Sequence, residues 1–460
     1  MPRRLYVFLI FAILLRFALG AIAFFYLPNG GYNSKPERAG YLFLDAYRRD
    51  SQARDLAQSD RALSRAFDQK FSSDQYGGLL WLSALVYRFV NPHPLTMILL
   101  AALCGAVGGV FVYLTGRQLF DEKTALLAAA IFFFYPESIL FGAAQMREPF
   151  LMTLLTMAFF GVVSWQGAQR GAWLWLAAAM GGMLLISPGF VLVSLVAAAG
   201  WLYLAGAGRR IPWQAAVAGL VLFLVALVVL SASWDALVAV KGGGALGVIA
   251  NWARETARWN AQVLKRSSGI VQLLFENLPR GLALPFVAVY GILQPVLPAA
   301  LIEPGILFWQ TLGIFRALGW YLLLPWVAFA PFSAWGISGD LRGRRQWVWL
   351  SLVVWAWILI AALRGGGDQW DNPRYRVILL GWMALLAART FYAPKTRWLW
   401  RILAVEAILL LVFTHWYTFR YWQIGFNLGI RNTLALALGA ALLLTGFDLL
   451  WQARKRKNTL

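Results

Sequence analysis

Charged residues, histidine and cysteine are all scarce in this chain of 460 residues. Asp, Glu, Lys and Arg make up 13% of it, about half the share that is usual in soluble domains. Hydrophobic residues make up 60%, so the composition excludes a water-soluble globule. The two histidines, His93 and His415, rule out histidine-based zinc sites and leave little for a Ser-His-Asp triad. With Cys104 as its single cysteine, the chain has no disulfide framework and no thiolate metal site.

Nucleotide-binding motifs are missing as well. No G-x-x-x-x-G-K-[ST] sequence occurs, so the chain has no motif to drive transport with ATP. Residues 242–247 fit G-x-G-x-x-G, but they follow an apolar run rather than a β-strand, which argues against dinucleotide binding. No internal repeat is evident, and this counts against transporters built from inverted repeats.

Long apolar runs dominate what is present. A helix needs about 17–25 apolar residues to cross a bilayer. The candidate spans are residues 5–27, 95–116, 124–140, 150–165, 171–186, 189–206, 212–230, 307–332, 346–363, 377–388, 398–414 and 433–451. The sequence therefore predicts an all-α integral membrane protein, a single domain over residues 1–460 with about twelve transmembrane helices.

The placement of Lys and Arg predicts the orientation of the chain. Cytoplasmic loops of membrane proteins are enriched in these residues. Arg3 and Arg4 precede the first run, and six later basic loops fall on the same side when the spans alternate. Those loops carry Arg117 and Lys123; Arg170; Arg209 and Arg210; Arg342, Arg344 and Arg345; Lys395, Arg397 and Arg401; and residues 454–457. We therefore expect a plasma (inner) membrane protein with both ends in the cytoplasm, and the net charge of +21 reflects topology rather than nucleic-acid binding.

The external segments follow from the same assignment. They are residues 28–75, the turns near 142–148 and 187, and residues 231–306, 364–376 and 416–432. We expect the Pro-rich stretch 282–302 to be re-entrant or interfacial, because a full crossing would place every later basic loop outside. External loops of this length usually carry function.

Two features inside the apolar runs predict contacts between helices. The first run has about 23 residues, longer than the apolar core of a cleavable signal peptide, so a retained anchor is expected. Arg16 within it is costly in lipid and is expected to face protein or to reach the interface. Gly105 and Gly109 are spaced as G-x-x-x-G, which predicts close helix packing.

The first external segment, residues 28–75, contains the first candidate site. From Asp50 onward its apolar residues recur at helical spacing, which predicts an amphipathic helix on the membrane surface. These residues are Ala53, Leu56, Ala57, Leu63 and Phe67. Asp50 falls at the edge of the apolar stripe and near the expected helix start, where a carboxylate is favoured. It is a candidate general base for an acceptor hydroxyl; the alternative is a simple helix cap.

Two further groups lie in the other external turns. Glu148 before Pro149 predicts a helix start, and with Arg147 it stands at the mouth of an apolar hairpin; helix capping alone is the alternative. Arg374 and Arg376 flank Tyr375 where the chain enters a late span. Paired guanidinium groups at this depth can hold a lipid phosphate, the alternative being interfacial anchors. Asp368 and Asp371 are expected to pair with these arginines.

The order of these features resembles the GT-C superfamily of membrane glycosyltransferases, which includes protein O-mannosyltransferases, aminoarabinose transferases and bacterial members of glycosyltransferase family 39. The likeness lies in D-x-x-x-x-D-x-A at residues 50–57, YGGLLWLSALVYRFV at 76–90, the segment 114–150 with its turn glutamate, and NPRYRVILLGWMALLAA at 372–388. It implies a GT-C-like helix bundle. The implied reaction moves a sugar from a polyprenyl-phosphate-linked donor to an acceptor at the external face, usually with inversion.

The resemblance also implies roles for individual residues. Asp50 corresponds to the catalytic base and Glu148 to a second acidic or acceptor-binding group. The substrate-binding candidates are Arg374, Arg376, Tyr375, Arg147 and Asp45. Many relatives carry adjacent acidic residues in the first loop, whereas Asp50 lies between Arg49 and Ser51. The choice between Asp45 and Asp50 as the base therefore stays open.

The expected partners are the lipid-linked donor, a lipid, glycan or protein acceptor and membrane lipids, with no nucleic acid. No cofactor is certain; a divalent cation is compatible, because the family includes members that require one and members that work without it. Two other functions remain as alternatives. One is an envelope polysaccharide polymerase or ligase, for which residues 231–306 are long enough. The other is a lipid flippase or secondary transporter, which would place ionisable groups at the bilayer midplane.

Overall fold

The computed structural model describes residues 2–68, 76–205, 217–226, 228, 279–335 and 341–457. Every regular element in these ranges is a helix, so the predicted all-α class is confirmed. Most of the predicted external segment 231–306, and with it residues 242–247, lies outside the described residues.

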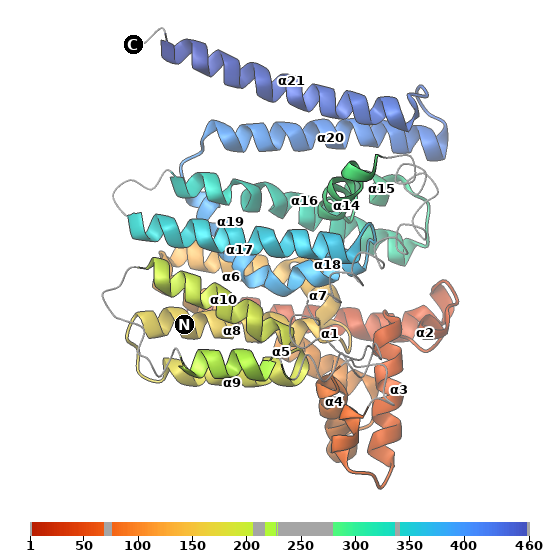
Figure 1. The fold of residues 1–460 in the computed structure, drawn as a ribbon. Helices are drawn as coiled ribbons and strands as arrows, with labels where there is room; N and C mark the ends of the chain where they lie inside the picture. The colour runs from red at the N-terminus through yellow and green to blue at the C-terminus, as the bar shows by residue number, and fades with distance from the viewer. Residues whose placement is uncertain are drawn as a thin grey trace.

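The long helices lie side by side, whereas α3 and α4 project crosswise from one end of the bundle (Figure 1). The first half of the chain forms α1 (Arg3–Gly30), α2 (Lys35–Arg38), α3 (Leu44–Gln58), η1 (Leu63–Phe67), α4 (Gly78–Phe89), α5 (Pro94–Leu119), α6 (Glu122–Phe134), α7 (Pro136–Gly142), α8 (Glu148–Gln166), α9 (Ala172–Ile186) and α10 (Gly189–Leu204). A helical stretch, Val217–Ala226, follows. The second half forms η2 (Arg280–Leu282), α14 (Ala283–Ile292), α15 (Leu297–Ile302), α16 (Leu307–Trp335), α17 (Leu341–Gly365), α18 (Asp371–Arg376), η3 (Val377–Leu379), α19 (Leu380–Tyr392), α20 (Arg397–Trp422) and α21 (Gly429–Lys457).

Seven of the described helices are long and apolar enough to cross a membrane. The number is eight if α6 and α7, which are bent by 51° at their junction, form one span. The protein is thus a multi-pass membrane protein, while the total of twelve spans stays a prediction. The two ends of the chain lie at the same end of the bundle (Figure 1), and the cytoplasmic location of that end also stays a prediction.

The Pro-rich stretch 282–302 forms two short helices instead of one span. α14 has ten residues and α15 has six, with a break between them. Ten helical residues extend for about 15 Å, which is half of the roughly 30 Å hydrocarbon thickness. Neither helix alone is long enough to cross, and the re-entrant or interfacial position of this stretch stays a prediction.

Arg16 faces protein, as predicted. It lies fully buried within α1, where its Nη1 donates to the Ala12 carbonyl at 2.9 Å and its Nη2 donates to Ser138 Oγ at 2.7 Å. A Cβ at Gly142 would lie 2.6 Å from Arg16 Cδ, so the missing side chain of this glycine makes room for the arginine. The charge is therefore hydrogen-bonded inside the bundle instead of exposed to lipid.

The first external segment differs from its prediction in two ways. α3 begins at Leu44, six residues before Asp50, so Asp45 and not Asp50 stands in the first turn. The predicted apolar stripe also ends early, because Leu63 and Phe67 belong to the separate helix η1. The buried side of α3 packs against α4 and η1 rather than forming a free amphipathic surface. The expectation of a helix starting near Asp50 was wrong, because Ala46 is also buried. It adds one turn, on the N-terminal side of Asp50, to the buried face of α3.

Small residues on α5 permit the close packing that the G-x-x-x-G spacing predicts. A Cβ at Gly105 would lie 2.9 Å from Pro149 Cβ of α8, and one at Gly109 would lie 2.5 Å from the Phe133 ring of α6. Both distances are below normal van der Waals contact. The two glycines therefore bring α5 against two different neighbours.

We expect Gly109→Ala to lower the free energy of unfolding by about 1–3 kcal/mol, because the added methyl group overlaps the rigid Phe133 ring. Gly181→Ala in α9 is the matched control, since a Cβ there meets no atom within 4 Å. Thermal unfolding of the purified protein in detergent measures both changes. Equal midpoints for the two variants would contradict the packing argument.

Candidate functional site

Arg374 joins three segments that are distant in sequence. Its Nη1 donates to Asp45 Oδ2 at 2.8 Å, and its Nε donates to Glu148 Oε1. Asp371 Oδ1 lies 3.9 Å from the same Nη1. We call these four residues the Arg374 cluster. The structure thus brings together one residue from each of the three predicted external groups.

Each carboxylate of the Arg374 cluster stands in the first turn of a helix. Asp45 is the second residue of α3, Glu148 is the first of α8 and Asp371 is the first of α18. The first turn of a helix has unpaired N–H groups and a partial positive charge, which favour a carboxylate. In α8 the following Pro149 also has the backbone geometry of a helix start. The predicted helix start at Glu148 is therefore confirmed, and capping and clustering occur together.

Burial differs within the Arg374 cluster. The Glu148 side chain is fully buried, that of Arg374 is 14% exposed and that of Asp45 is 41% exposed. Glu148 Oε2 has no hydrogen-bond partner among the residues that the structure describes. Arg147, 16% exposed, places its Nε 3.9 Å from Glu148 Oε1. Asp45 is therefore the most exposed carboxylate of the cluster, since the Asp371 side chain is 30% exposed and that of Glu148 is buried.

The local charges shift two pKa values in opposite directions. Partial burial by itself would raise the pKa of Asp45, but the Arg374 guanidinium more than offsets burial and lowers that pKa. Burial and the neighbouring Asp368 raise the pKa of Asp371 above its ordinary value. Asp45 is therefore the more strongly ionised of the two, as a proton acceptor at neutral pH must be.

Asp50 lies in a different environment. It is 3% exposed, accepts a hydrogen bond from the Tyr87 hydroxyl and forms an ion pair with Arg54 at 2.8 Å. Burial, followed by the charge of Asp50, raises the pKa of the nearby Tyr41. Both carboxylate oxygens of Asp50 are thus engaged: the Tyr87 contact joins α3 to α4, and the Arg54 contact lies within α3.

Arg374 and Arg376 do not form the predicted guanidinium pair. Arg376 is 1% exposed; it lies 3.5 Å above the Trp320 ring centre and donates to the Ile292 carbonyl. The Tyr375 ring lies beneath Arg364, at 5.3 Å. The expectation of paired arginines was wrong because side chains two positions apart on a helix point about 200° apart. Arg376 instead packs where α16 and α14 meet.

Asp368 also departs from its expected role. Its Oδ1 accepts hydrogen bonds from the backbone N–H groups of Trp370 and Asp371, at 2.6 and 2.7 Å. It therefore caps the start of α18 rather than pairing with an arginine. This cap orients the short helix that carries Arg374.

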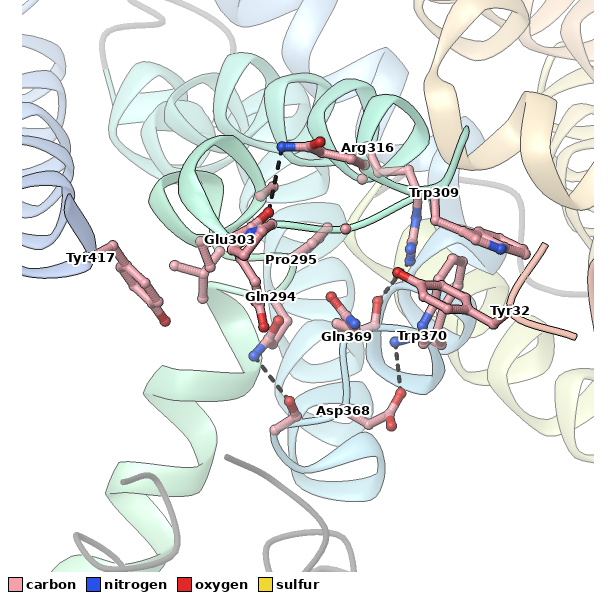
Figure 2. Close-up of a pocket in the computed structure, with 18 of the residues that line it drawn as sticks. Tyr32, Gln294, Pro295, Glu303, Trp309, Arg316, Asp368, Gln369, Trp370 and Tyr417 are labelled. Carbon is pink, nitrogen blue, oxygen red and sulfur yellow. Dashed lines mark hydrogen bonds between the residues drawn. The ribbon is translucent and has the colours of Figure 1, made fainter. Parts of the chain in front are cut away.

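A cavity of about 620 Å³ lies near the Arg374 cluster, and none of the four cluster residues is among those that line it. Leu44 and Asp368 line the cavity, while their neighbours Asp45 and Asp371 belong to the cluster. The other lining residues come from α2, the α14–α15 turn, the start of α16, residues 367–370 and the end of α20. Figure 2 shows aromatic and polar side chains facing this space, among them Tyr32, Gln294, Glu303, Trp309, Trp370 and Tyr417.

A buried ion pair supports one wall of the cavity. Arg316 Nε donates to Glu137 Oε1 at 3.0 Å, and both side chains are 1% exposed. Arg316 Nη2 donates to the Gln369 carbonyl at 2.7 Å, and its guanidinium lies 4.0 Å above the Trp370 ring centre (Figure 2). The prediction from sequence missed this pair. The signal was present, because ionisable residues inside apolar runs require partners.

The middle of the chain matches a known family. Residues 78–234, about a third of the chain, match the family described as dolichyl-phosphate-mannose-protein mannosyltransferase. The match begins with α4 and includes Arg147 and Glu148; it excludes Asp45 and Arg374. No curated protein matches the chain.

Several similar solved structures are those of an oligosaccharyltransferase from the archaeon Archaeoglobus fulgidus. Its AglB complex with an inhibitory peptide and a dolichol-phosphate has a TM-score of 0.43 at 14% identity, over 96% of this chain and 54% of that one. A form tethered to an acceptor peptide containing the NVT sequon has 0.44 at 13% identity, over 96% and 54%. A complex with Zn and sulfate has 0.35 at 14% identity, over 88% and 55%.

The chain spans about half the length of these oligosaccharyltransferases. The multi-pass helical fold and the family match over residues 78–234 extend the likeness found in the sequence itself. The likeness is to the GT-C superfamily of membrane glycosyltransferases, and the family model that carries it covers residues 78–234.

Proposed function

We propose that this protein transfers a sugar from a polyprenyl-phosphate-linked donor to an acceptor hydroxyl, at the external face of the plasma (inner) membrane. The observation that carries the proposal is the hydrogen bonding of one guanidinium, Arg374, to two carboxylates from other helices, Asp45 and Glu148. The family match supports the reaction type, because the family that matches residues 78–234 is named for transfer from a dolichyl-phosphate sugar. Charge patterning supports the external face.

Asp45 is the proposed general base. It removes the proton from the acceptor hydroxyl while that oxygen bonds to the anomeric carbon of the sugar. The bond between the anomeric carbon and the phosphate oxygen breaks, its electron pair stays on that oxygen, and the lipid phosphate leaves. A single displacement of this kind inverts the anomeric centre. We favour Asp45 over Asp50 because Asp45 is accessible, whereas both oxygens of Asp50 are engaged by Tyr87 and Arg54.

Arg374 is the proposed partner of the leaving phosphate. A guanidinium presents five N–H donors, and two of them account for the contacts with Asp45 and Glu148. The others are available to a phosphate at head-group depth, where a lipid-linked donor presents its charge. When the phosphate shares the guanidinium, Asp45 loses part of that stabilisation and its pKa rises. Donor binding would thereby make Asp45 a stronger base.

The nearby cavity suits the sugar of the donor. Its volume of about 620 Å³ falls within the usual range for small-molecule sites, about 300–1,000 Å³. Trp309 and Trp370 offer flat apolar faces and Asp368 offers a carboxylate (Figure 2). The cavity lies where helices end, beside the first external segment, rather than at mid-helix. This position favours a transferase over a transporter, whose substrate site is expected near the bilayer midplane.

Asp45→Asn should reduce the turnover number for sugar transfer by about 10²–10⁴-fold, because the amide cannot accept the acceptor proton. The assay uses purified protein with a series of polyprenyl-phosphate sugars. Asp50→Asn is the matched control: it should keep most of its turnover and lower the unfolding midpoint, since it weakens the contacts with Arg54 and Tyr87. An inactive Asp50→Asn protein of normal stability, beside an active Asp45→Asn protein, would overturn the choice of base.

The pH profile should report the Arg374–Asp45 contact. The base acts in its ionised form, and Arg374 favours that form by lowering the pKa of Asp45. In Arg374→Gln the pKa of Asp45 should rise, so on acidification the remaining activity is lost at a higher pH than in the wild type. Arg374→Lys keeps the charge and should shift the acid limb less. Measurement of kcat/KM against pH tests this; an acid limb that stays in place in Arg374→Gln would contradict it.

A further inference from the structure

The space between Asp45 and Glu148 is filled by the Arg374 guanidinium. Nη1 reaches one carboxylate at 2.8 Å while Nε of the same planar group reaches the other. A divalent cation shared by two carboxylates would sit about 2.0–2.6 Å from their oxygens. The guanidinium therefore occupies the position between the two carboxylates where such an ion would bind. It carries a fixed positive charge at that position.

The surrounding charges also disfavour a divalent ion. Arg147 lies 3.9 Å from Glu148, and its positive charge, like that of Arg49, acts on Asp45. Three guanidinium groups thus surround two carboxylates, so a doubly charged ion would meet repulsion from each of them. Among the residues that the structure describes, no three His, Cys, Asp or Glu side chains gather in a way that could hold a metal ion.

The third carboxylate does not compensate. The Asp371 carboxylate is an ion-pair partner of the Arg374 guanidinium, with Oδ1 3.9 Å from Nη1. The residues of the Arg374 cluster as arranged do not fit the divalent cation that some members of the superfamily require.

We propose that Arg374 takes the place of that cation, and that this protein transfers its sugar without a divalent metal ion. The inference rests on the proposed function. In it, the fixed N–H donors of Arg374 stabilise the negative charge that develops on the departing phosphate, a task that a metal ion performs elsewhere. A consequence follows for the two bridged carboxylates: without the guanidinium, the negative charges of Asp45 and Glu148 would lie on either side of a vacated space and would attract a cation in its place.

The first test is binding of Mn²⁺ to the purified full-length protein, followed by electron paramagnetic resonance at up to about 1 mM free ion, a range that includes weak carboxylate sites. Arg374→Ala should bind one Mn²⁺ more than the wild type. Adding Glu148→Gln to that variant should remove the gain. Glu148→Gln alone should bind as much Mn²⁺ as the wild type, and this arm does not depend on the folding of Arg374→Ala.

Two results would overturn the proposal. One is a wild-type Mn²⁺ site that Glu148→Gln abolishes; the other is a folded Arg374→Ala protein with no added site. The second test is transfer by the wild type after treatment with EDTA, which should be unchanged, whereas a loss of activity that Mn²⁺ restores would refute the inference. If no polyprenyl-phosphate sugar supports transfer under any condition, the proposed function fails, and the binding measurement still decides the inference.

Discussion

The hydrogen bonds of Arg374 are the interaction on which the rest of the site depends. Arg374 lies 329 positions from Asp45 and 226 from Glu148, so one side chain ties α18 to α3 and to α8. Removing one partner from a buried ion pair commonly costs about 3–5 kcal/mol, because the other charge stays desolvated. The cluster therefore fixes the relative positions of three helix starts, and the cavity beside them takes its shape from two of these segments.

Paired charges also organise the interior behind the site. Two arginines from distant helices bind side chains of the short helix α7. Ser138 accepts a hydrogen bond from Arg16 of α1, and Glu137 forms an ion pair with Arg316 of α16. The 51° bend between α6 and α7 places these adjacent residues inside the bundle. Each arginine lies in a helix that is apolar enough to span the membrane, where an unpaired charge is costly. Because an unpaired buried charge is unfavourable, each arginine stabilises the packing of its own helix against α7.

The sequence alone was sufficient to predict the helical membrane class, the likeness to the GT-C superfamily and the helix start at Glu148. These properties depend on local signals: apolar run length, Lys and Arg placement, and a Glu-Pro pair. It also identified the three segments that contribute to the Arg374 cluster, because each combines ionisable residues with the end of an apolar run. The buried environment of Arg16 followed from the same reasoning.

Which side chains meet could not be predicted in the same way. The start of α3 was misplaced because Ala46 is only weakly apolar and its burial depends on α4. Arg374 and Arg376 stand two positions apart in the sequence, yet their side chains point in different directions in α18. Arg374 contacts Glu148, whereas Arg376 packs on the Trp320 ring. The pairing of Glu137 with Arg316 depends on the bend after α6, which a hydropathy profile does not contain. Partner choice across 179 residues is a property of the folded bundle.

The burial of Arg16 has a consequence for the N-terminal helix. Signal anchors are often regarded as tethers that a protease could remove without harm to the body of the protein. Here α1 packs against α5, α6 and α7, and its arginine hydrogen-bonds to the helix that also carries Glu137. Cleavage after this helix would leave Ser138 without its donor and would uncover the inner faces of those three helices. The helix that the sequence predicts to be a membrane anchor is therefore also a structural part of the bundle.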